Sequence, residues 1–248
     1  MSDDKNTEWF ENWFDSTYYY ILYNHRDWKE AELFIDNLIS FLKPKPNSKV
    51  FDMPCGKGRH SVYMNKKGFD VTGIDLSPKS IACAKEYANQ HLSFFVHDMR
   101  KLFRENYFNI ALNLFTSIGY FENDKENADT ITSASAALKT GGVFILDFMN
   151  SEKIQKCLVS EENKNIDGIR FKVKRKIENG FVVKNIDVVD GDKKYSFFEK
   201  VKLLTLNDFK NYFSLSGLKI TRVFGNYSLD KFDENISERL IIVGRKVH

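Results

Sequence analysis

The chain has 248 residues, of which 42% are hydrophobic, 15% aromatic and 29% charged, and its formal net charge is +3. This composition supports one large domain, or a domain with a sub-domain, and excludes an intrinsically disordered chain. Three widely spaced cysteines without a C-x-x-C pair argue against a disulfide scaffold and against a metal site. Basic residues gather after residue 150 but are too sparse for a typical nucleic-acid binder, so nucleic acid is disfavoured as a partner.

The N-terminus and the apolar runs bear on location. Residues 1–5 are polar and largely acidic, unlike a secretion signal, and no apolar run approaches the ~20 residues that span a bilayer. Unpaired thiols fit a reducing compartment. We therefore expect a cytoplasmic protein with no membrane partner, present as a monomer or a homodimer.

Helical and extended patterns alternate over the first 150 residues. Apolar residues at helical spacing predict a helix over 28–42, which Pro44 and Pro46 end. Ser77 can cap a further helix that Pro78 opens. Helices are also predicted at 58–67, 78–89 and 124–138, and strands at 49–53, 69–74, 92–96, 108–114 and 142–148. This alternation predicts an α/β fold.

The pattern changes after residue 150. Residues 168–178 and 181–190 alternate in period two around Asn179-Gly180, which predicts a hairpin with a type I′ turn. A third strand at 193–204, a helix at 206–216 and strands at 218–225 and 238–246 are expected to follow. We therefore expect a core built from residues 29–150 and 205–248. Residues 151–204 would form an antiparallel β insert that binds the second substrate or makes an oligomer contact.

A glycine turn follows the first predicted strand. Gly56 and Gly58 let the backbone pass close to a ligand, and the next helix begins there with unpaired N–H groups. The second predicted strand ends in Asp75, where a carboxylate can bind the two hydroxyls of a ribose. Together these residues predict a nucleoside site at the carboxyl ends of two neighbouring strands.

The turn differs from a dinucleotide site in two positions. The third glycine of G-x-G-x-x-G is replaced by Ser61, and Asp52 precedes the turn. An acidic group there would repel a pyrophosphate but can accept hydrogen bonds from an ammonium group. A nicotinamide oxidoreductase is therefore disfavoured, and S-adenosylmethionine, which has an amino group and a ribose but no phosphate, is favoured.

The motifs resemble those of the class I S-adenosylmethionine-dependent methyltransferases, in their bacterial small-molecule branch. Residues 52–60 are similar to the D-x-P-C-G-x-G-R-H variant of motif I, and residues 71–77 to the V-x-G-x-D-x-S that follows. Residues 97–100, 113–121 and 138–142 resemble the motifs around strands three, four and five, with Thr140 in place of a proline. The resemblance implies a Rossmann-like, doubly wound, seven-stranded sheet with the last strand antiparallel, and a small antiparallel β insert after strand five.

Position by position, the resemblance also implies the cofactor-binding residues. The loop from Asp52 to Gly58 would hold the methionine part, with Arg59 or an N-terminal tyrosine such as Tyr20 on its carboxylate. Asp75 would bind the ribose, and Asp98 the adenine amino group. The full set is Tyr20, Asp52, Pro54, Cys55, Gly56, Gly58, Arg59, Asp75, Leu76, Asp98, Met99, Asn113 and Leu114.

Catalysis leaves a weaker mark on the sequence, because methyl transfer depends mainly on alignment and exclusion of water. A hydroxyl or ammonium acceptor needs a group that removes its proton. The leading candidates are His25 and Tyr120, with His60 and one of the tyrosines at 18–20 as alternatives.

Aromatic residues crowd the segment 9–28. They fit a lid, spanning residues 1–28, whose rings cover the sulfonium. Packing on the core or a dimer contact is the alternative explanation. The alternating cations from Arg170 to Lys176 in the insert form either a solvated face or a docking surface for an anionic substrate or a second subunit.

Three functions therefore stand at this point. The first is methyl transfer from S-adenosylmethionine, leaving S-adenosylhomocysteine, to a nitrogen or oxygen of a small molecule. The second is an RNA methyltransferase, supported by the basic C-terminal third. The third is a non-catalytic S-adenosylmethionine-binding or assembly protein. Residues 113–116 lack the Asn/Asp-Pro-Pro-Tyr/Phe motif that accompanies methylation of DNA bases or protein amides.

Overall fold

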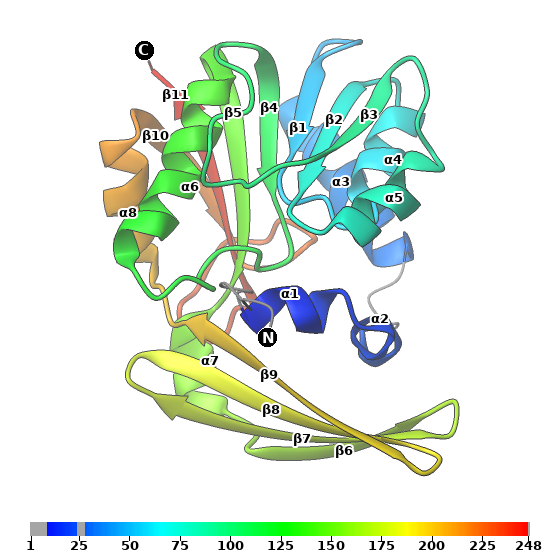
Figure 1. Cartoon of the computed structure of the whole chain (residues 1–248). Coiled ribbons are helices and arrows are strands. Elements are labelled where there is room, and N and C mark those ends of the chain that lie inside the picture. The colour runs from blue at the N-terminus through cyan, green and yellow to red at the C-terminus, as the bar shows by residue number, and fades with distance from the viewer. Residues whose placement is uncertain (1–8, 24–27, 248) are drawn as a thin grey trace, which may run out of the picture.

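A seven-stranded sheet forms the centre of the molecule (Figure 1). The computed structural model describes residues 9–23 and 28–247 of the chain. The strand order is β10-β11-β5-β4-β1-β2-β3, and β11 runs antiparallel to both of its neighbours. This sheet confirms the predicted α/β fold with an antiparallel last strand. The strands are β1 (Lys49–Asp52), β2 (Asp70–Asp75), β3 (Leu92–Val96), β4 (Phe108–Asn113), β5 (Leu138–Met149), β10 (Leu218–Phe224) and β11 (Arg239–Lys246).

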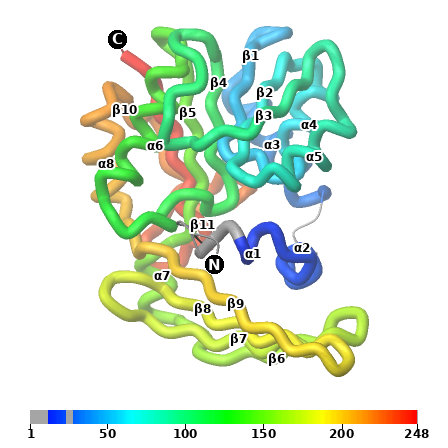
Figure 2. The backbone as a smooth tube through the Cα atoms, in the orientation of Figure 1, coloured from blue at the N-terminus to red at the C-terminus, as the bar shows by residue number. Residues whose placement is uncertain are grey.

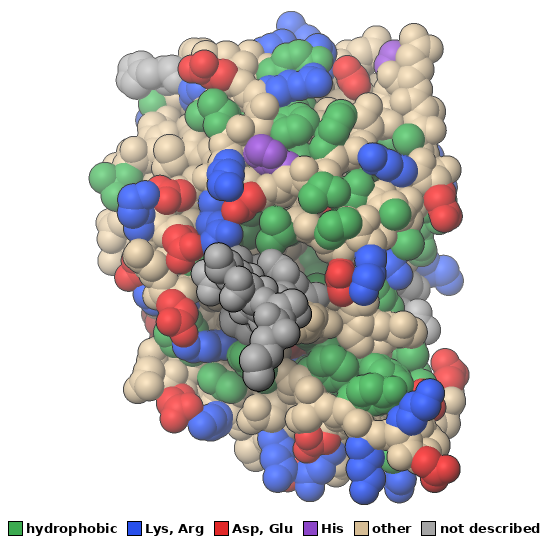
Figure 3. Space-filling view, viewed as in Figure 1, with side chains coloured by type: hydrophobic (Ala, Val, Ile, Leu, Met, Phe, Trp, Pro, Cys, Tyr) green, Lys and Arg blue, Asp and Glu red, His purple; other side chains and the backbone are tan. Residues whose placement is uncertain are grey.

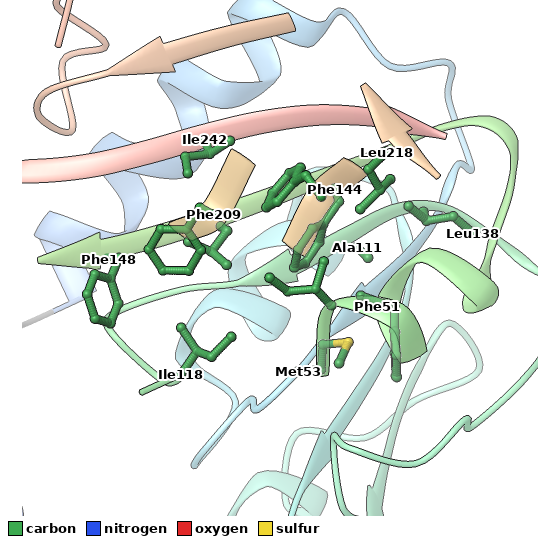
Figure 4. Packing of buried hydrophobic residues seen from close by; sticks show 14 of the residues in the cluster. Phe51, Met53, Ala111, Ile118, Leu138, Phe144, Phe148, Phe209, Leu218 and Ile242 are labelled. Carbon is green, nitrogen blue, oxygen red and sulfur yellow. The ribbon is translucent and has the colours of Figure 1, made fainter. Parts of the chain in front are cut away.

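Helices cover both faces of this sheet, and each face has its own hydrophobic core. α6 (Asp124–Ala137) and α8 (Leu206–Leu215) pack on one face, where Phe144, Phe148, Phe209 and Ile242 are buried together (Figure 4). The other face is covered by α3 (Trp28–Leu42), α4 (Arg59–Lys66) and α5 (Pro78–Lys85). Apolar burial on two faces explains why the central strands read as continuous hydrophobic runs.

Residues 161–202 form a separate four-stranded antiparallel sheet below the main one (Figure 1). Its middle hairpin turns at Asn179 and Gly180, both at positive φ, which is the geometry of the predicted type I′ turn. The strands are β6 (Glu161–Ile166), β7 (Ile169–Glu178), β8 (Phe181–Asp190) and β9 (Lys193–Lys202). We call this sheet the insert.

The observed elements differ from the predicted ones mainly at four points. Two elements, α7 (Ser151–Cys157) and β6, were not predicted from the sequence. β6 consists almost entirely of polar residues, and it forms by pairing with β7. The third predicted helix ends at Lys85 instead of Asn89. β5 begins at Leu138 because this residue already pairs with Phe108, and Gly141 at φ 78° continues the chain through an irregularity in the pairing.

Two short N-terminal helices lie between the main sheet and the insert (Figure 2). They are α1 (Trp9–Phe14) and α2 (Thr17–Leu22). Trp13 and Leu22 are buried with Phe171, Ile186 and Val188 of the insert in a third hydrophobic cluster. The N-terminal aromatic residues therefore attach the insert to the rest of the molecule.

The outer face of the insert is charged and exposed (Figure 3). Of the predicted cationic row on β7, Lys172 pairs with Glu161 at 3.0 Å and Lys176 with Glu178 at 2.7 Å. These partners neutralise part of the row, as on an ordinary solvated face. None of the helices in the part of the chain that the structure describes has the length and apolar composition to cross a bilayer.

Helix α8 offers a direct test of the first core. Phe209 is 0% exposed and its ring meets that of Phe148 at 5.2 Å, whereas Leu215 on the same helix is 81% exposed. Phe209→Ala should lower the free energy of unfolding by about 3–5 kcal/mol, because it leaves a cavity under the sheet. Leu215→Ala should change it by less than about 0.5 kcal/mol. Urea unfolding of both variants compares the two; equal losses would contradict this packing.

Candidate active site

The glycine loop lies where β1 ends, and Asp75 at the end of β2 holds it. Gly56 donates its backbone N–H to Asp75 Oδ2 at 2.8 Å, and Asp75 Oδ1 accepts the N–H of Ser77 at 2.9 Å. Gly56 has φ 55° and no atom within 4 Å of where a Cβ would stand, so it borders open space. Burial raises the pKa of Asp75 above its ordinary value. The carboxylate thus shapes the loop and still faces the cavity beside it.

A second carboxylate lies one strand further along. Asp98, after β3, accepts hydrogen bonds from Arg100 Nε at 3.0 Å and Arg100 Nη2 at 2.9 Å. Arg100 also pairs with Glu126 of α6 at 2.6 Å. Burial alone would raise the pKa of Asp98, but the hydrogen bonds from Arg100 outweigh it and hold that pKa below its usual range. Asp98 is therefore an oriented, ionised acceptor.

These groups line one cavity of about 540 Å³, a size typical of small-molecule sites. It lies between the carboxyl ends of the parallel strands and the helices α1 and α2. Ten of the predicted cofactor residues lie on its wall. They are Tyr20, Pro54, Cys55, Gly56, Arg59, Asp75, Leu76, Asp98, Met99 and Leu114.

The three other predicted residues, Asp52, Gly58 and Asn113, are not among the residues that line the cavity. A Cβ on Gly58 would stand 2.9 Å from the Phe94 ring, so this glycine serves close packing at φ 84°. Asp52 and Asn113 are fully buried at the ends of β1 and β4. Asn113 Nδ2 donates to the carbonyl of Met53 at 2.7 Å instead of facing the cavity.

Asp52 and Asn113 each keep one buried oxygen without a hydrogen-bond partner among the described residues. The other carboxylate oxygen of Asp52 accepts the hydroxyl proton of Ser61 at 2.6 Å. Burial raises the pKa of Asp52 to about 7, with the Asp75 charge adding to the effect and Ser61 opposing it. A buried carboxylate with an unused oxygen directly beneath the glycine loop suits a cationic ligand group.

Five rings form a continuous wall on the remaining side of the cavity. In order of contact they are Tyr120, Phe14, Tyr19, Tyr23 and Phe115, and we call them the aromatic wall. Their centroid separations along this path are 5.3, 5.0, 4.9 and 6.4 Å. The wall joins α1 and α2 to the segment after β4.

The insert supports this wall from behind through a buried ion pair. Glu199 accepts hydrogen bonds from Trp13 Nε1 and Tyr23 Oη, both at 2.7 Å, and pairs with Lys184 Nζ at 2.5 Å. Burial would raise the pKa of Glu199, but Lys184 and these donors hold it below its ordinary value. Lys184 also donates to Tyr23 Oη at 2.5 Å. The insert thus fixes the orientation of the Tyr23 ring.

The candidate proton acceptors are placed as follows. His25 lies outside the described residues. Tyr120 lies on the cavity wall, yet its hydroxyl donates to the Thr116 carbonyl, and burial raises its pKa well above the ordinary value. This geometry favours a wall and positioning role for Tyr120 over the expected proton-accepting role. His60 lines the cavity, and burial lowers its pKa to about 3, so it is a neutral imidazole at physiological pH.

Other cavity residues were not expected from the sequence. Glu86 comes from a segment where nothing but its charge distinguishes it, Arg100 from the strand-three motif at residues 97–100, and Phe115 from the loop after β4. The resemblance to the strand-four motif covered residues 113–121, so Phe115 and Ser117 could have been found there. Lys184 and Glu199 carried no local signal, because the insert reaches the site only in the folded molecule.

Comparison with known proteins addresses the chemistry of this site. Residues 50–142, which contain the glycine loop, Asp75 and Asp98, match a family model described as a methyltransferase domain. A methyltransferase-named protein of Bacillus subtilis, YqeM, is 30% identical over 109 residues, which are 43% of this chain and 44% of that protein. The chain carries the methyltransferase domain of an S-adenosylmethionine-dependent enzyme.

Longer alignments include a methyltransferase-named protein of Geobacillus, which is 22% identical over 96% of this chain and 99% of its own length. An N,N-dimethyltransferase of Streptomyces venezuelae, which acts on a dTDP-linked amino sugar, is 25% identical over 78% of this chain and 84% of that protein.

Solved structures share the fold of this methyltransferase. An S-adenosylmethionine-dependent methyltransferase from Clostridium acetobutylicum superposes with a TM-score of 0.79 at 21% identity, covering 94% of this chain and 98% of that one. The sugar N-methyltransferase KedS8 from Streptoalloteichus superposes with a TM-score of 0.77 at 16% identity over 100% and 99% of the two chains. Both superpositions span at least 94% of this chain, so they include the insert as well as the main sheet.

The methyltransferase cavity fits S-adenosylmethionine. The unused oxygen of Asp52 and the open space over Gly56 suit the ammonium group and the backbone of its methionine part. Asp75 suits the ribose hydroxyls, and Asp98 the adenine amino group. Arg59 suits the carboxylate and also lies 5.5 Å from the centre of the Phe115 ring.

Asp52 gives the free methyltransferase a specific pH dependence. Because its folded pKa of about 7 lies above its ordinary value of 3.8, its contribution to stability is greatest below pH 3.8 and is lost as the pH rises through 7. Asp52→Asn cannot ionise, so its free energy of unfolding relative to wild type should rise by about 1–3 kcal/mol between pH 5 and 8. Thermal unfolding across that range measures it. Asp192→Asn, on an exposed turn, is the control, and parallel curves for Asp52→Asn and wild type would contradict the burial of an unpaired oxygen.

The ion pair behind Tyr23 should matter more for stability than a surface pair does. Glu199→Gln leaves the Lys184 ammonium half-buried without its counter-charge, and it should lower the free energy of unfolding by about 3 kcal/mol. Asp129→Asn breaks the exposed pair with Lys125 at 2.7 Å and should cost less than about 0.5 kcal/mol. Urea unfolding of both variants makes the comparison. A loss no larger in Glu199→Gln than in Asp129→Asn would mean that the pair is solvated.

Proposed function

We propose that this methyltransferase transfers the methyl group of S-adenosylmethionine to an amine nitrogen of a small molecule. The aromatic wall carries this proposal, because its five rings line the same cavity as the groups assigned to the cofactor. A small-molecule acceptor fits a cavity of about 540 Å³ that lies beneath α1 and α2.

The chemistry of the wall favours nitrogen over oxygen. Bound S-adenosylmethionine supplies an electrophilic methyl group on a sulfonium. The faces of aromatic rings attract a cation, so the wall stabilises both the sulfonium and the ammonium that forms when an amine is methylated. A neutral amine can attack through its lone pair without losing a proton first, whereas a hydroxyl acceptor needs a base in the site. Burial raises the pKa of Tyr19 and Tyr120 well above the ordinary value and keeps these two hydroxyls protonated.

Several relatives support an amine acceptor by their names. Besides the amino-sugar N,N-dimethyltransferase of Streptomyces venezuelae, a glycine/sarcosine N-methyltransferase of Parasynechococcus marenigrum is 31% identical over 134 residues. The acceptors in these names differ greatly in size, but each is methylated on nitrogen. Their shared element is the chemistry we propose for this chain.

The chain's own residues would contribute orientation and exclusion of water. We propose that α1 and α2 cover the bound cofactor, since Tyr20 donates or accepts a hydrogen bond with Ser80 of α5 at 3.0 Å across the cavity edge. The ring of Tyr20 also lies 3.2 Å from Lys57 Nζ of the glycine loop. The insert would complete the acceptor side through Tyr23.

The first test is binding of S-adenosylhomocysteine by thermal shift, with NAD as the control ligand. At about a hundred times the dissociation constant, binding should stabilise the fold by roughly 2.7 kcal/mol, or about 5–10 °C for a chain of this size. Asp75→Ala should remove the shift and Tyr20→Ala should reduce it. An equal shift with NAD would contradict the cofactor assignment.

The second test is a turnover assay that identifies the class of acceptor. It measures the release of S-adenosylhomocysteine in the presence of different acceptors. Amino acids and amino sugars should support turnover, whereas their hydroxyl analogues and tRNA should not. Turnover that requires tRNA would replace the proposal by an RNA methyltransferase. Cofactor binding without turnover on any of these acceptors would favour the non-catalytic alternative.

A further inference from the structure

The segment after β4 brings one member of the aromatic wall into the cavity through an unusual backbone. Phe115 and Thr116 have φ values of 63° and 55°, and both are L-residues with bulky side chains in the left-handed region. Two consecutive residues in this region persist only where surrounding contacts outweigh the strain. We call residues 114–117 the Phe115 loop.

The contacts that hold this loop come from Asp147, near the end of β5. Its Oδ2 accepts the backbone N–H of Phe115 at 2.8 Å, and its carbonyl accepts the N–H of Thr116 at 3.0 Å. Tyr227 also donates to Oδ2, at 3.0 Å. Asp147 is 0% exposed and does not line the cavity. Two of these bonds therefore fix the loop from behind.

Arg239 of β11 contacts both Asp147 and the Phe115 loop. Its Nε pairs with Asp147 Oδ1 at 2.8 Å, and its Nη2 donates to Thr116 Oγ1 at 2.9 Å. The Tyr120 hydroxyl donates to the Thr116 carbonyl, so the same loop orients a second ring of the aromatic wall. A strand more than a hundred residues away in sequence thus sets the geometry of the wall.

A buried ion pair is by itself weak evidence for stability, because desolvation offsets much of the attraction. Here both partners also form hydrogen bonds with the strained Phe115 loop. We therefore infer that the main effect of the pair is to hold this loop in one conformation. The loop in turn places the Phe115 ring 5.5 Å from Arg59 and 6.4 Å from the Tyr23 ring.

We propose that Asp147 and Arg239 are positioning residues of the methyl-transfer centre, which hold the Phe115 loop so that the Phe115 ring faces the sulfonium of the bound cofactor. The inference rests on the cofactor site of the proposed function, but not on the nature of the acceptor. A ring in that position distinguishes S-adenosylmethionine, which has a positive sulfur, from S-adenosylhomocysteine, which has a neutral one.

The test is the ratio of the dissociation constants of these two ligands, measured by titration calorimetry on the full chain. Asp147→Asn should weaken S-adenosylmethionine about three- to tenfold relative to S-adenosylhomocysteine. A general loss of stability would weaken both ligands alike and leave the ratio unchanged. Tyr227→Phe keeps its ring against Phe34, at 4.5 Å, and should shift the ratio about twofold even if Asp147→Asn does not fold.

Asn150→Ala is the matched control. Asn150 is also buried at the end of β5, and it donates to the carbonyls of Glu234 and Ser237 just before β11, but it has no hydrogen bond to the Phe115 loop. It should reduce stability without changing the ratio. A double-mutant cycle tests whether Asp147 acts through Phe115. In a Phe115→Ala background, Asp147→Asn should have no further effect on the ratio of the two dissociation constants.

The outcomes separate the two proposals. An unchanged ratio in both Asp147→Asn and Tyr227→Phe, or the same change in Asn150→Ala, overturns the positioning role. So does an additional effect of Asp147→Asn in the Phe115→Ala background. Wild-type protein that binds both ligands but methylates no amine contradicts the proposed acceptor and leaves the positioning role intact. Wild-type protein that binds neither ligand contradicts both.

Discussion

The carboxyl ends of the parallel strands β1 to β4 meet at one edge of the main sheet, and the organisation of the active site depends on this constraint. The strand order reverses between β1 and β4, so the loops that follow them leave in opposite directions and open a crevice. The bond from the Gly56 N–H to Asp75 ties the loops of β1 and β2 together at that edge. Most of the groups that fit the cofactor follow the ends of these strands, whereas Tyr20 comes from α2 and Arg59 begins α4.

The aromatic wall is assembled from three distant segments. The N-terminal segment contributes Phe14, Tyr19 and Tyr23, the segment after β4 contributes Phe115 and Tyr120, and the insert holds Tyr23 from behind. The N-terminal aromatic residues have two different surroundings, since Trp13 packs in the core of the insert while Tyr19 and Tyr20 line the cavity. The packing of Trp13 and Leu22 with the insert attaches these two helices to the rest of the molecule.

Three ion pairs lie at or behind the cavity wall, and each makes further polar contacts. They are Asp98 with Arg100, Glu199 with Lys184, and Asp147 with Arg239. The fixed donors and acceptors of these pairs orient the side chains around them. Asp52 is different, because one of its oxygens has no hydrogen-bond partner among the described residues.

The sequence by itself determined the elements with strong local signals. The helix over 28–42, the turn at Asn179-Gly180 and the glycine loop followed by Asp75 lie where periodicity and turn chemistry placed them. The tertiary structure decided which of the motif residues reach the cavity. Asp52 and Asn113 are fully buried at the ends of β1 and β4, and Gly58 packs against the Phe94 ring, so none of the three lines the cavity. β6 forms only by pairing with β7, and Glu199, Lys184 and Arg239 act across long sequence separations. Such contacts leave no period in the local sequence, since they arise from the packing of one sheet against another.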